Sequence, residues 1–403
     1  MNRAPLSLLT VTTLFPNPIQ NTLGVFVETR LRKVLETGEA TARVLAPIPW
    51  LPSVVNHSSL GPVHRVPYEL IRNGIEVEHP RYLVVPKIGM SLTPFTLYRA
   101  MRRSLMRRFA AGHRVDLIDA HYFYPDGVAA VWLSKEFDIP VVVTARGTDL
   151  NLIPQYRVPR RMIQRAAARA DGLVTVCAAL KDSLIELGVP AERVTVLRNG
   201  VDLDLFHPAD HWAARARHGF RRRTIGSVGH LVERKGHHHV IRALVHLPDT
   251  DLIIVGSGPD RRTLEELAVR LGVAERVRFL GAVDQGMLSE IYGGLDALVL
   301  ASSREGWANV LLEAMACGTP VVASAVWGTP EVVAAPEAGV LMPTLDANGV
   351  VVALGNLFAA PPDREATRRY AERFDWNSTT RGQLDLFRDI LVRRKGNQPN
   401  SSR

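Results

Sequence analysis

Hydrophobic and polar positions alternate in blocks along this chain, with short apolar, β-branched runs separated by longer segments that have a helical repeat. We predict strands at 6–14, 115–123, 140–147, 172–179 and 193–200, and then at 223–229, 250–258, 276–281, 295–302 and 319–324. Their apolar character is nearly continuous, which is typical of strands covered by helices on both faces. Segment 260–272 has a helical pattern that begins after Pro259 and ends at Gly272. Two successive β/α series predict two doubly wound parallel sheets.

The stretch at 200–222 holds no clear strand and ends in a cluster of Arg and Gly, so it marks a domain boundary. We expect an N-terminal Rossmann-like domain at 1–205, a C-terminal one at 206–375 and a helix at 376–395. In such sheets ligands bind at the carboxyl ends of the strands, and we expect the two domains to face a cleft there.

Charged residues are distributed unevenly between the two halves of the chain. The chain has 403 residues and a formal net charge of +9. Residues 1–200 carry 25 Lys and Arg against 16 Asp and Glu (25 − 16 = +9), whereas 201–403 balance (24 − 24 = 0). This asymmetry indicates an anionic partner for the first half, either nucleic acid or a membrane surface. A basic surface that serves only solubility is the alternative.

Cysteine content and hydropathy bear on the compartment. Cys177 and Cys317 are the only cysteines and lie in apolar stretches, so no disulfide framework is expected, which suits a reducing compartment. No run reaches the ~18 uninterrupted apolar residues of a membrane-spanning helix. We expect a cytoplasmic protein and leave peripheral contact with the inner face of the plasma membrane open.

The segment SREGWANVLLEAMACGTPVVAS at 303–324 carries the most informative chemistry. A loop there follows a buried strand and precedes a helix, so the amides of Asn309 and Val310 and the positive end of the helix suit a phosphate. Glu305 and Glu313 would flank that anion and accept hydrogen bonds from sugar hydroxyls. This pattern predicts a nucleotide-sugar. The alternative makes Glu305 a helix-start acid and Glu313 a surface residue.

A second loop, in GHLVERKG at 229–236, supplies cations for a diphosphate. Arg234 and Lys235 follow a predicted strand, and Lys235 precedes a glycine that permits close approach to a ligand. The His run at 237–239 does not predict a metal site, because adjacent positions on a helix point in different directions.

These segments occur in an informative order: VLRNGVDLDLFHP, GHLVERKG, VGSGPDRRTLEEL, SREGWANVLLEAMACGTPVVAS and GTPEVV. In that order they closely resemble the retaining glycosyltransferases of family 4, and there is a looser similarity to teichuronic-acid-type transferases. The resemblance implies the GT-B fold, with the helix at 376–395 packing back towards the N-terminal domain. It also implies transfer with retention from a nucleotide-diphosphate-sugar, with no obligatory metal or other cofactor. The departing phosphate is expected to accept the acceptor's proton.

The resemblance also assigns roles in donor binding. Glu305 contacts hydroxyls of the transferred sugar, Glu313 holds the ribose and Lys235 binds the diphosphate. His230 stands where the family usually has Arg, and Arg234 can substitute for it. The remaining expected donor contacts lie in one loop: Gly306, Trp307, Ala308, Asn309 and Val310.

On the acceptor side, Gly24 matches a glycine-containing first loop that approaches the ligand closely. The resemblance places His121 near the transferred sugar, as a catalytic residue beside Lys235 and Glu305. Arg146 replaces a His of the family pattern, and Asp149 is expected to contact the acceptor. As an alternative, His121 is a buried histidine with satisfied hydrogen bonds.

The helix at 95–112 sets Tyr98, Met101, Leu105 and Phe109 on one face and arginines on another, and 157–169 adds further basic residues. Basic amphipathic helices lie on anionic bilayers, which favours docking where a lipid-linked acceptor is presented. The alternative is a surface helix whose apolar face packs on its own sheet.

Competing functions remain open from the sequence. The turn IIVGSGPD suggests an NAD-dependent oxidoreductase, although Arg261 stands where a third glycine is needed. A noncatalytic nucleotide-sugar-binding scaffold and a sugar-nucleotide epimerase are further alternatives. Nucleic-acid binding is not expected, because charge alone suggests it and no recognition motif accompanies the charge. We expect a glycan or lipid-linked acceptor in cell-envelope or exopolysaccharide synthesis.

Overall fold

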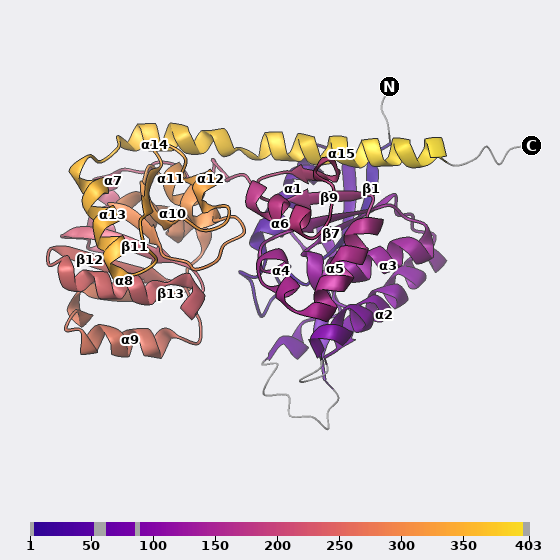
Figure 1. Ribbon diagram of the computed structural model, residues 1–403, viewed down its shortest axis with the longest axis horizontal. Coiled ribbons are helices and arrows are strands. Elements are labelled where there is room, and N and C mark those ends of the chain that lie inside the picture. Colours follow the sequence, from indigo (N-terminus) through magenta and orange to yellow (C-terminus); the bar gives the residue numbers. More distant parts are fainter. Residues whose placement is uncertain (1–3, 52–61, 85–88, 398–403) are drawn as a thin grey trace, which may run out of the picture. The chain divides into compact units, whose positions relative to one another are not determined.

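A computed structural model describes residues 4–51, 62–84 and 89–397 of the chain (Figure 1). The chain forms two compact units, one of residues 1–197 together with 377–403, the other of residues 198–376. This division falls a few residues before the expected boundary at 205. The amide of Val201 donates to the carbonyl of Phe374, and Phe206 lies against the ring of Tyr292, so the segment after 197 belongs to the second unit.

The first unit contains an eight-stranded sheet in the order β10-β9-β8-β7-β1-β2-β5-β4. Its strands are β1 (Leu6–Val11), β2 (Ala40–Leu45), β4 (Glu69–Arg72), β5 (Ile75–Glu78), β7 (Leu117–His121), β8 (Val141–Ala145), β9 (Gly172–Thr175) and β10 (Val194–Val196). Neighbours are parallel except β4 and β5. β3 (Ile48–Trp50) and β6 (Arg81–Leu83) form a separate parallel pair. The chain order reverses between β1 and β7, and ligands bind at the carboxyl ends of strands at such a switch point.

The helices of the first unit are α1 (Val25–Glu36), α2 (Gly89–Ala110), α3 (Val128–Phe137), α4 (Thr148–Asn151), α5 (Arg157–Arg169), α6 (Ala178–Glu186) and α15 (Trp376–Asn397). Trp376, at the start of α15, is the last residue of the second unit. Leu384, Phe387 and Ile390 of α15 are buried in one cluster with residues of β1, β7, β8 and β9. The last helix therefore completes the core of the first unit on one face of its sheet (Figure 1).

Helix α2 uses its apolar face inside the first unit. Met101 and Leu105 are fully buried, and so is Leu97. Arg102 pairs with Glu136, while Arg107 and Arg108 of the same helix both pair with Glu78. The distances from guanidinium nitrogen to carboxylate oxygen in these three pairs are 2.6, 2.8 and 2.9 Å. Met101 and Leu105 of the predicted stripe are thus used for packing, in line with the alternative of a surface helix, while Tyr98 and Phe109 are half-buried.

The second unit contains six parallel strands in the order β13-β12-β11-β14-β15-β16. They are β11 (Arg223–Val228), β12 (Thr250–Val255), β13 (Val277–Gly281), β14 (Ala297–Leu300), β15 (Val321–Ser324) and β16 (Gly339–Met342). Numbered along the chain, the order is 3-2-1-4-5-6, that of a Rossmann-type nucleotide-binding domain, whose switch point lies between β11 and β14. The helices are α7 (His211–His218), α8 (His237–Ala243), α9 (Arg261–Arg270), α10 (Gln285–Gly294), α11 (Asn309–Ala316), α12 (Thr329–Val332), α13 (Ala347–Ala359) and α14 (Arg364–Ala371).

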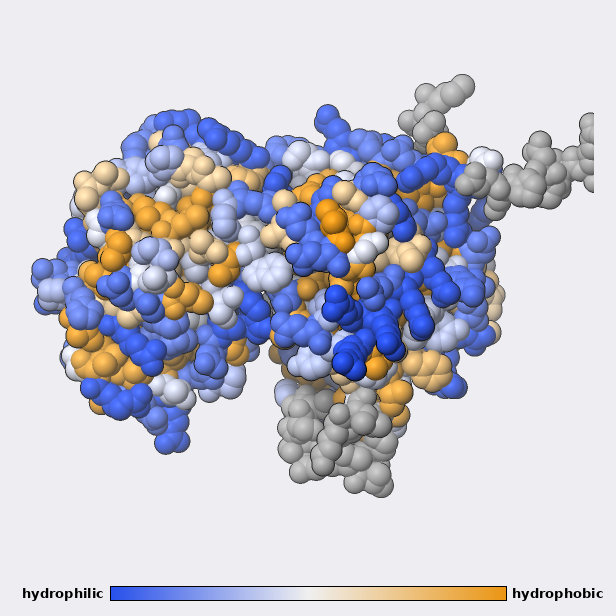
Figure 2. All heavy atoms as spheres, in the orientation of Figure 1, coloured by the Kyte–Doolittle hydropathy of each residue, from blue (hydrophilic) through white to orange (hydrophobic). Residues whose placement is uncertain are grey.

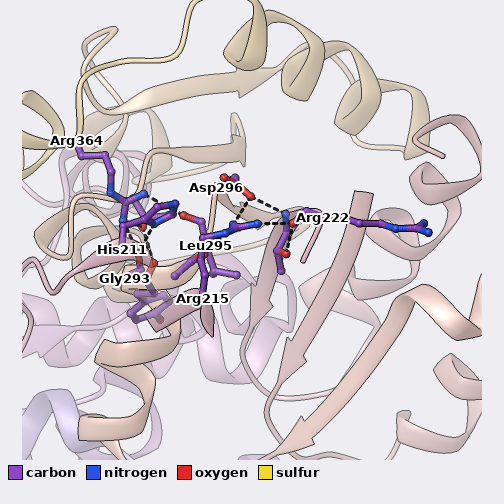
Figure 3. Close-up of polar contacts among 11 residues, drawn as sticks. His211, Arg215, Arg222, Gly293, Leu295, Asp296 and Arg364 are labelled. Carbon is purple, nitrogen blue, oxygen red and sulfur yellow. Dashed lines mark hydrogen bonds and ion pairs between the residues drawn. The ribbon is translucent and has the colours of Figure 1, made fainter. Parts of the chain in front are cut away.

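Two buried or half-buried arginines fasten helices of the second unit to the start of β14 (Figure 3). Arg215 of α7 donates to the carbonyl of Gly294 and pairs with Asp296 at 2.8 Å. Arg364 of α14 donates to the carbonyls of Gly293 and Leu295. Each guanidinium therefore satisfies carbonyls that the end of α10 leaves without helical partners.

Within the described residues, no helix combines the length and apolar character needed to cross a membrane. Cys177 and Cys317 are both buried.

Candidate functional site

Lys235 and Glu305 meet at the switch point of the second sheet. Lys235 ends a short helical turn (Glu233–Lys235) that follows β11, and Glu305 lies in the loop that follows β14. Lys235 Nζ lies 2.6 Å from Glu305 Oε1, and the two side chains are 14% and 8% exposed. The sequence predicted both residues for one site, and the fold brings them into contact. Burying this ion pair costs free energy of folding, because both charges lose their hydration.

The two loops are held together by their backbones. Gly236 has φ +71°, and a Cβ there would lie 1.8 Å from the carbonyl oxygen of Ala301. The amide of Ser303 donates to the carbonyl of Arg234 at 2.8 Å. Any side chain at Gly236 would push the loop after β11 away from the loop after β14, and Lys235 would leave Glu305.

The start of α11 offers fewer amides than the sequence suggested. The amide of Asn309 donates to the carbonyl of Trp307 at 3.1 Å, so it is already used. The amide of Val310 donates to no residue in the described part of the chain. Leu311 donates to Ala308 at 3.1 Å. The positive end of α11 therefore presents Val310 as its available donor.

Trp307 forms an apolar wall next to this helix start. Its side chain is buried, its ring centroid lies 6.0 Å from that of Phe374, and the Arg198 guanidinium carbon lies 5.9 Å from the Trp307 ring centroid. Its Nε1 hydrogen finds no acceptor among the described residues. Gly306 precedes it and is half-buried, whereas Ala308 is buried.

Glu313 lies about one turn into α11 and has a partner that the sequence did not reveal. The hydroxyl of Tyr292, on α10, donates to Glu313 Oε2 at 3.2 Å. Burial raises the pKa of Glu313 to about 7, against a partly compensating effect of the Tyr292 hydroxyl. Tyr292 lies in an ordinary apolar stretch, so no local pattern marks it.

The two other cation candidates differ in setting. His230 is exposed at the end of β11, and Arg234 is half-buried. The Arg234 guanidinium forms no ion pair with the described residues, so its charge is available at the same loop as Lys235. This position is compatible with the expectation that Arg234 substitutes where His230 replaces arginine.

In the first unit, His121 ends β7 at the switch point and is fully buried. Its Nε2 lies 3.1 Å from Asp119 Oδ2, and its Nδ1 lies 2.6 Å from Arg146 Nη2. A guanidinium only donates, so Nδ1 is the acceptor and Nε2 carries the hydrogen. Burial lowers the pKa of His121 to about 4, although Asp119 opposes this shift. His121 is therefore a neutral imidazole with both nitrogens occupied.

A residue from the last helix extends this buried network. Gln383 of α15 donates to Asp119 Oδ2 at 3.0 Å and accepts from Arg30 Nε at 2.7 Å. Asp119 precedes His121 by two residues on the same strand, so it shares a face with His121, and the alternation of a strand could have revealed it. Gln383 lies 264 residues away from Asp119 in the sequence, and no local pattern could have revealed it.

Asp149 holds backbone rather than an exposed surface. It is fully buried, and its carboxylate accepts the amides of Phe123 and Gly147, both at 2.6 Å, and of Arg146. Burial raises the pKa of Asp149. Its oxygens are thus engaged in fixing the loop after β8, and the acceptor contact expected for it stays a prediction.

Gly24 is required by a contact with its own domain. It has φ +66°, and a Cβ there would lie 2.2 Å from the carbonyl oxygen of Leu14. The loop after β1 folds back on itself at this point, before α1 begins. The structure thus shows a close approach of backbone to backbone at Gly24, and the ligand contact expected for it stays a prediction.

The glycines of the oxidoreductase-like turn have the same kind of explanation. A Cβ at Gly256 would lie 1.9 Å from the carbonyl oxygen of Gly229, and one at Gly258 would lie 2.4 Å from that of Leu231. Both glycines allow the loop after β12 to pack on the loop after β11. No dinucleotide is needed to account for them.

The His run does not form a ligand cluster. His237 is buried and its Nδ1 lies 2.8 Å from Ser227 Oγ, while His238 and His239 are half-buried. In the parts of the chain that the structure describes, no group of three or more His, Cys, Asp or Glu side chains could hold a metal ion.

The architecture has close counterparts among solved structures. Sucrose-phosphate synthase from Thermosynechococcus elongatus aligns with a TM-score of 0.80 and 20% identity, over 96% of this chain and all of that one (100%). Anabaena Alr3699/HepE in complex with UDP-glucose aligns with a TM-score of 0.72 and 19% identity, over 95% and 100%. With two α/β parallel-sheet units and a long C-terminal helix, the chain has the GT-B fold of glycosyltransferases.

Sequence comparison is more specific. The family model "Glycosyl transferases group 1" matches residues 210–374, and "Glycosyltransferase Family 4" matches 58–205. Relatives called D-inositol 3-phosphate glycosyltransferase include that of Saccharomonospora viridis, 31% identical over 70% of this chain and 72% of the relative. The relative from Mycobacteroides abscessus is 32% identical over 68% of this chain and 65% of its own length. The chain belongs to glycosyltransferase family 4.

Proposed function

We propose that this chain transfers a sugar from a nucleotide-diphosphate-sugar to a glycan or lipid-linked acceptor, with retention of configuration. The observation that carries the proposal is the Lys235–Glu305 pair at the β11/β14 switch point of a family 4 chain. Structural neighbours are described as complexes with UDP and with UDP-glucose, which supports a nucleotide-sugar as donor.

The donor side would work by charge and hydrogen bonding. Lys235, Arg234 and the amide of Val310 stabilise the negative charge that develops on the departing diphosphate. Glu305 accepts hydrogen bonds from hydroxyls of the transferred sugar, and Glu313 accepts them from the ribose. Lys235 then exchanges part of its contact with Glu305 for phosphate oxygens when the donor enters.

In the proposed reaction the bond from the sugar C1 to the diphosphate oxygen breaks, and a bond from C1 to the acceptor oxygen forms on the same face. The acceptor's hydroxyl proton passes to the departing phosphate oxygen. We propose no obligatory metal and no other cofactor, because Lys235, Arg234 and the start of α11 supply positive charge at this site.

The acceptor side would lie at the β1/β7 switch point of the first unit. His121 has no free nitrogen, so it serves there as a neutral, fixed wall rather than as a base. The acceptor hydroxyl would be oriented by groups around this strand end. Arg146 is one of them, and its side chain is 8% exposed.

We place the acceptor in cell-envelope or exopolysaccharide synthesis, and the protein in the cytoplasm with peripheral contact at the inner membrane face. The basic N-terminal half supports this placement, because an anionic surface attracts it.

The direct test is the thermal midpoint of the protein with UDP, GDP, ADP, dTDP or NADH, each with and without a chelator. A ligand at 100 times its Kd stabilises a protein by about 2.7 kcal/mol, which moves the midpoint by several degrees. We expect one nucleoside diphosphate to stabilise the wild type and Lys181→Met, with chelator present, and to act weakly on Lys235→Met. Stabilisation by NADH alone, or by none of these ligands, would overturn the proposal.

A further inference from the structure

We propose that α5 is the docking surface of the first unit for an anionic lipid bilayer. This helix (Arg157–Arg169) contains no acidic residue, and each of its five arginines is exposed. The arginines are Arg157, Arg160, Arg161, Arg165 and Arg169. The proposal deepens the proposed function, since a lipid-linked acceptor is presented at such a surface.

The arginines form a row that repels itself. Arg157, Arg161, Arg165 and Arg169 follow one another at intervals of four residues, which on a helix places successive side chains about 6 Å apart on one face. Like charges at this spacing destabilise a helix. The repulsion within the row therefore lowers the stability of the isolated protein, and an anionic surface would neutralise it.

No described residue relieves the repulsion. None of the five arginines of α5 forms an ion pair with a residue in 4–51, 62–84 or 89–397. Exposed arginines of the second unit are treated differently, since Arg262 pairs with Glu266 and Arg369 with Glu365, each four residues away. The α5 row differs from these two pairs in having no carboxylate on its own helix.

The packing of α5 fixes the direction of the row. Pro159, Ile163, Ala166 and Ala167 are buried, so the opposite face of the helix is the one that carries the arginines. Figure 2 shows a band of the most hydrophilic side chains over α5, with apolar side chains beside it. The charged band is consequently a fixed surface.

An aromatic groove adjoins the row. About 500 Å³ in volume, it is lined by Phe95 and Tyr98 of α2, by Trp132, Lys135 and Glu136 of α3, and by Arg169 of α5. The rings of Tyr98 and Trp132 meet edge to face with centroids 5.9 Å apart. Aromatic rings beside cationic side chains are typical of the boundary between lipid headgroups and acyl chains.

Exposed apolar side chains complete the surface. Phe95 is 47% exposed at the groove, and Tyr156 and Val158, at the start of α5, are 49% and 47% exposed. Arginines would contact lipid phosphates while these apolar groups enter the headgroup region. The combination favours a bilayer over a nucleic acid, which would bind the arginines and leave Val158 in water.

The test is sedimentation of the full chain with vesicles of phosphatidylcholine alone and of phosphatidylcholine mixed with phosphatidylglycerol, at low salt. The variant Arg157→Gln/Arg161→Gln/Arg165→Gln removes three charges from the row. A matched control, Arg262→Gln/Arg270→Gln/Arg369→Gln, removes three charges from exposed positions of the second unit.

We expect the wild type and the control to bind the anionic vesicles and the α5 variant to bind about 100-fold more weakly, since each arginine near an anionic surface contributes about a factor of five. Equal loss in the control and the α5 variant would show an effect of net charge alone and would overturn the proposal. The proposal would also be overturned if the wild type bound a short duplex DNA and anionic vesicles did not displace that DNA.

Failure of docking and failure of the proposed function are distinguishable in the same samples. Stabilisation by a nucleoside diphosphate reports the donor site in the second unit, and we expect the α5 variant to keep it. The thermal midpoint without ligand verifies that the variant is folded. Vesicle binding that persists in the folded α5 variant overturns the surface and leaves the donor site untouched.

Discussion

At the scale of single residues, Glu305 has to serve two partners in turn, the Lys235 ammonium and, in the proposed reaction, hydroxyls of the sugar. Glu305→Gln keeps the shape and removes the charge. We expect kcat/KM for sugar transfer to fall by about 10²–10³-fold, the range seen when one preorganised electrostatic contact is lost. Binding of the nucleoside diphosphate, which lacks the sugar, is expected to change much less.

The control for that experiment is Glu266→Gln, at an exposed position of α9. It should leave both transfer and binding unchanged. Full transfer activity in Glu305→Gln would contradict the role that we assign to the carboxylate.

Glu313 makes stability depend on pH. Its folded pKa of about 7 lies above the ordinary value of 4.5, so the folded protein holds the proton more tightly than the unfolded chain. This contribution is fully present below about pH 4.5 and is lost as pH rises through about 7, by roughly 3 kcal/mol in total. In Glu313→Gln the group cannot ionise, so the variant should gain stability relative to the wild type between pH 5 and pH 8.

Denaturant unfolding of the two proteins at pH 5 and pH 8 measures this gain. Taking the difference between variant and wild type matters, because burial also raises the pKa of Asp126 to about 7 and adds a similar pH dependence to both proteins. A difference that does not change with pH would show that the Glu313 carboxylate is solvated.

At the scale of elements, helix α15 supplies Phe387 to the core that covers one face of the first sheet. Phe387 is fully buried, whereas Val392 on the same helix is 65% exposed. We expect Phe387→Ala to cost about 3–5 kcal/mol and Val392→Ala to change stability by less than about 0.5 kcal/mol. Thermal midpoints of the two variants test this, and similar midpoints would show that α15 does not belong to the core.

The elements also show what a sequence can and cannot predict. The central strands β1, β7, β8, β9, β11, β12 and β14 were predicted because burial on both faces makes them continuously apolar. β2 and β4 were missed because polar residues interrupt them: β2 is ATARVL, and β4 is ELIR at the edge of the sheet. The apolar stripe of α2 was predicted, but the sequence left open whether a membrane or the first sheet covers it, since periodicity does not say what covers a face.

The candidate site divides in the same way. Lys235, Glu305 and Glu313 lie within short, informative segments, and contact between the first two follows from strand order. Tyr292 reaches Glu313 in the second unit, and Gln383 reaches Asp119 in the first, each from another element, so only the folded chain reveals them. The predicted use of the Asn309 amide failed for a local reason, the bond to the Trp307 carbonyl.

At the scale of the whole molecule, the two units differ in how the chain builds them. The second is one continuous segment, 198–376, with its own buried cluster across β11, β12 and β14. The first joins 1–197 to the last residues of the chain. We expect 198–376, produced alone, to unfold cooperatively and to bind the same nucleoside diphosphate as the full chain.

Residues 1–197 alone should be less stable and prone to aggregation, because removal of α15 exposes an apolar face of the first sheet. Adding a peptide of residues 377–397 should raise the thermal midpoint of that fragment. Equal midpoints for the fragment with and without the peptide would contradict this account of the core.

The return of α15 to the first unit has a consequence for biosynthesis. Because a chain emerges from the ribosome amino end first, residues 1–197 are made long before the helix that covers their sheet. The second unit has all its strands and its core available while α15 is still being synthesised. The unit that begins first is therefore finished last, and until α15 has been made and has packed, its uncovered sheet is the part of the nascent chain most exposed to chaperones and to misassociation.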